Sequence, residues 1–230
     1  MYQKRYNDDM AGGALQRAMI DAIRDLQART TALEERLRTV YDRCESAEAT
    51  IPDCVALGPR GGCLITPWHA VGAAHYPHPV GATIRYSWGE RRVAESETVA
   101  GTDIQVYRLD QQAPEAVQPA RYLPWDWPRH LPTDRTGKHL RRRLRALTVK
   151  SGGSLHETTV SSLGEDFGAD PAVTQTGDSG QPVWLPLPEP VLVGCWQYRG
   201  SGPAVHHWWR EISRVTAEMG VAPEEAVWNQ

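Results

Sequence analysis

The chain has 230 residues and a formal net charge of -3, with 40% hydrophobic and 23% charged residues. This balance is ordinary for a soluble globular protein and excludes the charge signature of a nucleic-acid-binding or membrane-surface chain. No apolar run reaches the length of a membrane span, and residues 1–9 carry charge with no apolar core after them. We therefore expect no membrane segment, no signal peptide and a cytoplasmic location, with association with a virion as the alternative.

Residues 1–50 are predicted to form an amphipathic helix. Between residues 19 and 44, apolar side chains recur at alternating spacings of four and three, which is the heptad pattern of a coiled coil. This seam consists of Met19, Ile23, Leu26, Thr30, Leu33, Leu37, Val40 and Cys44. Such a short coiled coil is marginal and needs a partner to bury its stripe. We expect residues 15–44 to form a homo-oligomer or to bind a protein partner; the alternative is a helix packed on its own domain.

After residue 51 the pattern changes to short apolar runs separated by Gly and Pro. Runs of this kind with regular turn signals predict an all-β barrel or sandwich. They cover residues 63–66, 82–86, 104–109, 147–149 and 191–196. Three prolines exclude a central strand over residues 122–133. Helical spacing returns over residues 207–219.

Three motifs in the β-rich part supply a histidine, an aspartate and a serine, in that order. They are Gly61-Gly62-Cys63-Leu64-Ile65 running on to Ala73-Ala74-His75, then Thr102-Asp103-Ile104, then Gly177-Asp178-Ser179-Gly180. A serine hydroxyl is a poor nucleophile until a base takes its proton, and a histidine oriented by a buried carboxylate is such a base. Each motif alone is weak. Their joint order, beside strand-like segments, indicates nucleophilic catalysis.

With these motifs, residues 51–220 resemble the trypsin/chymotrypsin-like serine peptidases. The resemblance implies a mainly β fold of two six-stranded antiparallel β-barrels, here preceded by the long helix and ending in a short C-terminal helix. It places barrel 1 at about 51–120, a linker at 121–133, barrel 2 at about 134–206, the C-terminal helix at 207–219 and a tail at 221–230.

The resemblance also implies a serine endopeptidase acting on a protein or peptide substrate. His75 would be the base, Asp103 its orienting carboxylate and Ser179 the nucleophile. The backbone N–H groups of Gly177 and Ser179 would form the oxyanion hole. No cofactor, metal or nucleic-acid partner is expected. The four cysteines contain no C-x-x-C pair, and His75-x-x-His78 lacks further ligands nearby.

Substrate preference is predicted from the residue six before the serine, which lies at the base of the primary pocket in relatives. Here it is Val173, in a segment that reads as a strand over residues 172–176. An apolar base argues against a preference for Lys or Arg, because no carboxylate waits there. Gln197 and Tyr198 are expected on the opposite wall. Small or apolar substrate side chains are therefore predicted.

Two devices of the secreted relatives are missing. The places of a conserved cysteine pair around the histidine are filled by Arg60 and Tyr76, and no Ile-Val-Gly-Gly maturation site precedes the domain. In relatives that freed terminus pairs with the aspartate before the serine. We therefore predict that the pocket forms without maturation and that Asp178 has another partner.

Several alternatives remain open. The chain could be a structural or docking protein whose protease-like barrel has little or no turnover, or an esterase on the same fold. His69, six residues before His75, is expected on the strand that leads to it rather than in the site. The basic residues 138–145 are interpreted as a solvated strand, with an acidic partner such as nucleic acid as the alternative.

Overall fold

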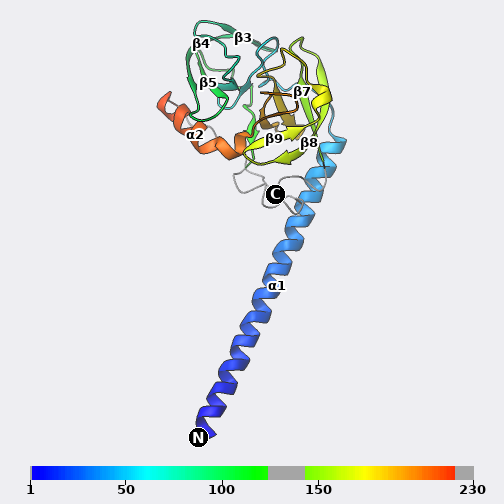
Figure 1. Ribbon diagram of the computed structural model, residues 1–230, viewed down its shortest axis with the longest axis vertical. Helices are drawn as coiled ribbons and strands as arrows, with labels where there is room; N and C mark the ends of the chain where they lie inside the picture. The colour runs from blue at the N-terminus through cyan, green and yellow to red at the C-terminus, as the bar shows by residue number, and fades with distance from the viewer. Residues whose placement is uncertain (1, 124–142, 221–230) are drawn as a thin grey trace. The chain divides into compact units, whose positions relative to one another are not determined.

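The structure is a computed structural model that describes residues 2–123 and 143–220 (Figure 1). The chain divides into two compact units, residues 1–40 and 41–230. The expected N-terminal helix is present as α1, Tyr2–Ser46, an uninterrupted helix of 45 residues. Within the described ranges, no helix is long and apolar enough to cross a membrane.

The apolar stripe of α1 is exposed where its side chains are described. Met19, Ile20, Ile23 and Leu26 expose between 42% and 58% of their surface. Cys44, which the heptad pattern places in the same seam, is instead fully buried in the second unit. The predicted seam is therefore wrong at its end, because the last turns of α1 already belong to the folded domain.

The first sheet has five strands in the order β1-β2-β5-β4-β3, and each neighbouring pair is antiparallel. Strand β5 is buried at five of its six positions, as its apolar run predicts, while β3 alternates exposed and buried residues. The strands are β1 (Cys63–Leu64), β2 (His69–Ala73), β3 (Thr83–Tyr86), β4 (Gly89–Thr98) and β5 (Ile104–Leu109).

The second sheet has seven strands in the order β12-β9-β8-β7-β10-β11-β6. All neighbours are antiparallel except β6 and β11, which run parallel. The strands are β6 (Arg121–Tyr122), β7 (Leu144–Val149), β8 (Leu155–Leu163), β9 (Asp166–Ala169), β10 (Pro182–Leu185), β11 (Val191–Cys195) and β12 (Ser201–Pro203).

The two sheets confirm the predicted two-barrel, mainly β architecture, with five and seven strands in the described ranges rather than six and six. The additional strand of the second sheet comes from the predicted linker. Its first two residues form β6 and add a strand to the second sheet, while residues 124–133 lie outside the described part of the chain. The start of the predicted second barrel, residues 134–142, and the predicted tail, 221–230, also lie outside it.

The C-terminal helix α2, Val205–Glu218, joins the two sheets (Figure 1). It contacts β5 of the first sheet and β11 of the second. Its apolar face buries Ile212 and Val215, which belong to one continuous core with residues of both sheets. Burial of an aliphatic side chain contributes about 1.5–3 kcal/mol, so this face stabilises the pairing of the sheets. Trp208 adds a hydrogen bond from its indole N–H to the Glu165 carbonyl at 3.2 Å.

Arg145 explains part of the basic stretch. It lies on β7 and donates from one guanidinium nitrogen to the carbonyls of Cys44 and Ala47, both at 2.8 Å. The last carbonyls of a helix lack intrahelical partners, and a cation there also complements the helix dipole. Its other nitrogen pairs with Glu157 across the strands. This residue of the basic stretch therefore caps the end of α1, whereas residues 138–142 lie outside the described chain.

Candidate active site

Strand register brings the histidine and aspartate motifs together. Strands β2 and β5 are antiparallel, and Ala73 at the end of β2 faces Ile104 at the start of β5. The residues just after β2 therefore lie beside those just before β5. The Ala74 N–H donates to the Asp103 carbonyl at 2.8 Å, which continues the ladder by one pair. The His75 N–H then donates to Asp103 Oδ1 at 2.7 Å.

The side chains of His75, Asp103 and Ser179 form one chain of hydrogen bonds. His75 Nδ1 lies 2.6 Å from Asp103 Oδ2, and His75 Nε2 lies 2.8 Å from Ser179 Oγ. A carboxylate only accepts hydrogen bonds, so the proton of neutral His75 is on Nδ1 and the lone pair on Nε2 faces the hydroxyl. The Asp103 side chain is 11% exposed and that of His75 is 44% exposed. The carboxylate is thus shielded while the imidazole remains open to a substrate.

Ser179 lies in a tight loop that packs against the segment before β1. Gly177 and Gly180 flank it with φ of +98° and +84°, a region that side chains resist. A Cβ on Gly180 would stand 2.2 Å from the Arg60 carbonyl oxygen. The Gly62 N–H donates to the Gly180 carbonyl at 3.0 Å. The Gly-Gly motif before β1 therefore packs against the serine loop, which accounts for glycine on both sides of this contact.

The two predicted oxyanion donors lie on either side of Asp178. In the described part of the chain, neither the Gly177 N–H nor the Ser179 N–H donates a hydrogen bond to another protein group. The intervening Asp178 N–H is bonded to the Gln175 carbonyl at 3.1 Å. Both predicted donors are thus unbonded within the described residues, and their assignment to an oxyanion hole stays a prediction.

Asp178 has a partner that sequence reasoning did not identify. Its buried carboxylate lies 3.1 Å from Lys150 Nζ. Lys150 stands directly after β7, and no motif or spacing distinguishes it from other lysines. The sequence predicts that Asp178 pairs with a group other than a maturation terminus. In the structure this group is Lys150.

Arg60 and Tyr76, the residues expected at the places of a cysteine pair, contact each other. The Arg60 guanidinium lies 4.6 Å from the centre of the Tyr76 ring, and it also donates to the Pro77 carbonyl. Arg60 adopts a φ of +70°, the one positive value among non-glycine residues of the described ranges. A cation–π contact therefore connects the segment before β1 to the loop that carries His75. All four cysteines are free.

The chain matches solved structures of serine proteases over most of its length. Neuropsin, a serine protease expressed in the limbic system of mouse brain, gives a TM-score of 0.50 at 15% identity, covering 74% of this chain and 99% of neuropsin. Kallikrein-related peptidase 10 in complex with Zn2+ gives 0.52 at 16% identity, covering 75% of this chain and 98% of the peptidase. The fold is chymotrypsin-like. No protein-family model and no curated protein matches the sequence.

The residues predicted to line the primary pocket of this chymotrypsin-like fold come from two loops. Val173 is half-buried and ends a short 3-10 helix, Pro171–Val173, so the predicted strand over residues 172–176 is wrong. The Asp170 carboxylate caps this turn by accepting the Ala172 N–H at 2.9 Å. Gln197 and Tyr198 lie exposed between β11 and β12, and Tyr198 is 73% exposed. Their assignment to the pocket stays a prediction.

Three other histidines of the described residues are buried and take no part in the hydrogen bonds between His75, Asp103 and Ser179. His69 lies on β2, as predicted, with Nδ1 2.8 Å from the Thr66 hydroxyl. Burial lowers its pKa to about 4, and burial also lowers that of His206 to about 4. His78 bonds the Gly61 carbonyl through Nε2 at 3.0 Å, and burial lowers its pKa too. The described residues contain no cluster of ligands able to hold a metal ion.

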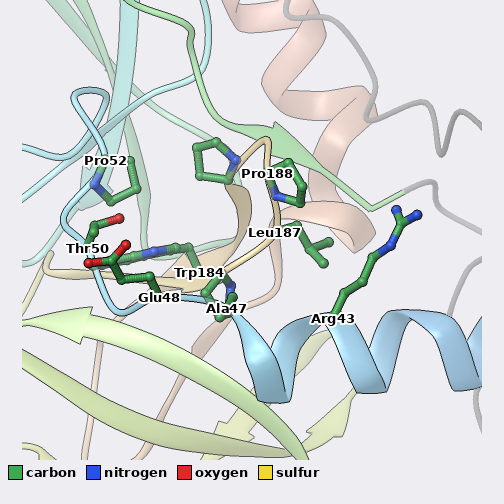
Figure 2. Close-up of a pocket in the computed structure, with 10 residues that line it drawn as sticks. Arg43, Ala47, Glu48, Thr50, Pro52, Trp184, Leu187 and Pro188 are labelled. Carbon is green, nitrogen blue, oxygen red and sulfur yellow. The ribbon is translucent and has the colours of Figure 1, made fainter.

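A cavity of about 740 Å³ lies apart from the site, between the end of α1 and the β10–β11 hairpin (Figure 2). Trp184 and Leu187 line it on the hairpin side, with the helix end on the other (Figure 2). Its walls contain none of His75, Asp103 or Ser179. The remaining walls come from Arg43, Ala47, Glu48, Thr50, Pro52, Pro186, Pro188 and Pro190.

Proposed function

We propose that the protein is a serine endopeptidase that acts through His75, Asp103 and Ser179. The observation that carries this proposal is the hydrogen-bonded chain from Asp103 Oδ2 through the imidazole to Ser179 Oγ, with distances of 2.6 and 2.8 Å. These distances lie within reach for direct proton transfer. The chymotrypsin-like fold supports the same chemistry. A docking protein without turnover would not need the imidazole in this tautomer beside an open hydroxyl.

In the proposed reaction, Ser179 Oγ attacks the carbonyl carbon of the scissile peptide bond while its proton moves to His75 Nε2. The Asp103 carboxylate stabilises the imidazolium that results and keeps its orientation. The tetrahedral intermediate then collapses: the C–N bond breaks, and the proton on Nε2 goes to the leaving amine. Water repeats the sequence on the acyl-enzyme, releasing the carboxylic acid and restoring the serine.

The oxyanion of each tetrahedral intermediate needs donors that are already in place. The N–H groups of Gly177 and of the nucleophile Ser179 itself are the proposed donors, since they lie on either side of Asp178 and are otherwise unbonded in the described residues. One such donor is worth about 3 kcal/mol of transition-state stabilisation. This explains the demand for glycine at 177, whose φ of +98° orients a donor that a side chain would hinder.

Small or apolar side chains are the proposed substrate preference. The pocket-base position is the half-buried, uncharged Val173, so a substrate lysine or arginine would be desolvated there without a counter-charge. Gln197 and Tyr198 are proposed to contact the substrate from the loop between β11 and β12. Their exposure leaves them accessible to an arriving peptide.

The N-terminal helix is proposed to mediate self-association through the part of residues 15–44 that precedes the buried Cys44. Its exposed Met19, Ile23 and Leu26 repeat at heptad spacing on a helix of 45 residues. A second copy would supply the same stripe and cover it, which is the usual closure of a symmetric coiled coil. The solution mass of the whole chain, compared with that of a variant carrying Ile23→Asp and Leu26→Asp, tests this: the variant should be monomeric.

The peptidase proposal is tested with the full chain, a peptide library and matched ethyl esters of the same acyl groups. Peptide cleavage should occur and should be lost in Ser179→Ala. Ser154→Ala is the matched control. Like Ser179, Ser154 has its Oγ within hydrogen-bond distance of a histidine nitrogen, here His156 Nε2 at 3.0 Å, but it lies in another loop. Turnover of esters alone would favour the esterase alternative. No turnover of either by a folded chain would favour the docking-protein alternative.

A further inference from the structure

We propose that Lys150 is a positioning residue that holds the Ser179 loop in its working arrangement from within the uncleaved chain. The proposal rests on the proposed peptidase function. It begins with Asp178, whose side chain is only 2% exposed although it directly precedes the nucleophile. A buried carboxylate is strongly destabilising unless a cation and hydrogen bonds compensate its lost hydration. Its partners therefore decide the conformation of this loop.

Two loops supply the partners of the Asp178 carboxylate. Lys150 Nζ lies 3.1 Å from Oδ2, and the Ser151 N–H donates to Oδ1 at 3.0 Å. The Gln175 N–H donates to Oδ2 at 3.0 Å from within the serine loop itself. The carboxylate thus joins the β7–β8 turn to the loop of the nucleophile. It is the charged centre of this connection.

Lys150 is itself held by the β7–β8 hairpin. Its N–H donates to the Ser154 carbonyl at 2.9 Å, and its carbonyl accepts the Gly153 N–H at 2.7 Å. Its side chain is 13% exposed, so little water competes for the ammonium. The hairpin therefore presents a fixed cation to the serine loop, and no chain terminus is needed to supply one.

The proposed oxyanion donors depend on this anchor because they are the neighbours of Asp178. The Asp178 N–H bonds the Gln175 carbonyl at 3.1 Å, and its own carbonyl accepts the Gln181 N–H at 3.0 Å. Without the cation, the Asp178 carboxylate is more stable when it rotates into water than when it stays buried. This rotation of Asp178 would move the amides of Gly177 and Ser179 away from the positions proposed for the oxyanion donors. Lys150 therefore acts on catalysis through Asp178, without touching the substrate.

The test compares Lys150→Met and Lys150→Arg with the control Arg108→Met, all in the full chain with its intact mass verified. Arg108 also pairs with a carboxylate, Glu95 at 3.0 Å, but at the surface. We expect Lys150→Met to lower kcat on a peptide substrate by about 100-fold, the loss typical of a displaced oxyanion donor, with a much smaller change in KM. Lys150→Arg should recover at least about tenfold of this, whereas Arg108→Met should stay within about twofold of the unaltered chain.

Hydrogen exchange of the bonded amides of Gln175, Asp178, Gly180 and Gln181 provides a readout that needs no activity. Exchange should be at least about tenfold faster in Lys150→Met, since the anchored loop opens more often. Unchanged exchange together with unchanged kcat would overturn the proposal, as would an intact chain that becomes active only after cleavage before the domain. If the unaltered chain shows no turnover, the peptidase proposal fails, while the exchange experiment still decides the role of Lys150.

A second variant covers the case in which Lys150→Met does not fold. The double variant Lys150→Met, Asp178→Asn leaves no unpaired charge in the interior and keeps the size of both side chains. It should fold but remain at least about tenfold below the unaltered chain in kcat, because a neutral contact anchors the loop less firmly. Full activity of the folded double variant would overturn the proposal.

Discussion

The contact between the serine loop and the segment before β1 can be tested with two glycines that share one backbone conformation. Gly180 and Gly153 both have a φ of +84°. A Cβ on Gly180 would stand 2.2 Å from the Arg60 carbonyl oxygen and 3.1 Å from its carbon, whereas nothing lies within 4 Å of a Cβ on Gly153. Alanine at either position suffers the same left-handed strain, about 1–2 kcal/mol. Only Gly180→Ala adds a backbone clash.

The clash cannot relax cheaply, because hydrogen bonds hold both sides. The Gly180 N–H donates to the Trp196 carbonyl at 2.8 Å, and the Gly180 carbonyl accepts the Gly62 N–H at 3.0 Å. Overpacking of this kind adds about 1–3 kcal/mol, so Gly180→Ala should lower the free energy of unfolding by about 3–5 kcal/mol in total. Gly153→Ala should lower it by about 1–2 kcal/mol.

Urea unfolding followed by circular dichroism measures both values. Because Gly180 follows Ser179, the folded fraction of Gly180→Ala should also lose about 100-fold in peptide turnover, the loss expected when a catalytic group moves by about an ångström. Equal destabilisation by the two substitutions would refute the reasoning, since it would leave no energetic role for the contact with Arg60.

Three further predictions follow from contacts in the same domain. Arg60→Met should lower the free energy of unfolding in urea by about 2 kcal/mol. A double-mutant cycle of Arg60→Met with Tyr76→Leu should give a coupling energy of about 1 kcal/mol, and a value near zero would rule out the cation–π contact. The buried His206 has a pKa of about 4 when folded and near 6.5 when unfolded, so the free energy of unfolding should fall as the pH drops from 6.5 to 4, by up to about 3 kcal/mol. His206→Gln should make the free energy of unfolding, measured by urea at each pH, less dependent on pH. Val173→Asp should shift peptide preference towards Lys and Arg in a library profile, and an unchanged profile would remove Val173 from the pocket.

The triad candidates could be predicted from the sequence because each belongs to a short motif, and the histidine and aspartate motifs adjoin apolar strands. His75 follows β2 and Asp103 precedes β5, and the antiparallel register of those strands makes them neighbours. Local sequence patterns therefore predict this part of the candidate site. The two helices and the mainly β character followed from periodicity in the same way.

The supports of the site could not be predicted, because they are pairings between distant segments. Lys150 meets Asp178 from another hairpin, and Arg60 meets Tyr76 across a loop. The spacing of hydrophobic residues does not indicate which basic side chain contacts which distant carboxylate or aromatic ring. The end of the α1 seam failed for a related reason, since the heptad pattern continues through Cys44 after the helix has entered the folded domain.

The turn at Val173 could have been read from the sequence. Asp170-Pro171 combines a side chain that caps a turn with a residue whose φ suits its first position, and the structure shows both features in the short helix Pro171–Val173. Residues 172–176 have a strand-like composition, but the turn signal of Asp170-Pro171 decides the local conformation.

The central claim is that Ser179 is a nucleophile activated by His75. Labelling of the full chain with a fluorophosphonate probe, followed by peptide mapping, tests it most directly. The account predicts one covalent adduct on Ser179, lost in Ser179→Ala and strongly slowed in His75→Ala, with Ser154→Ala labelled normally. A folded chain that stays unlabelled, or a label on any other residue, would contradict it.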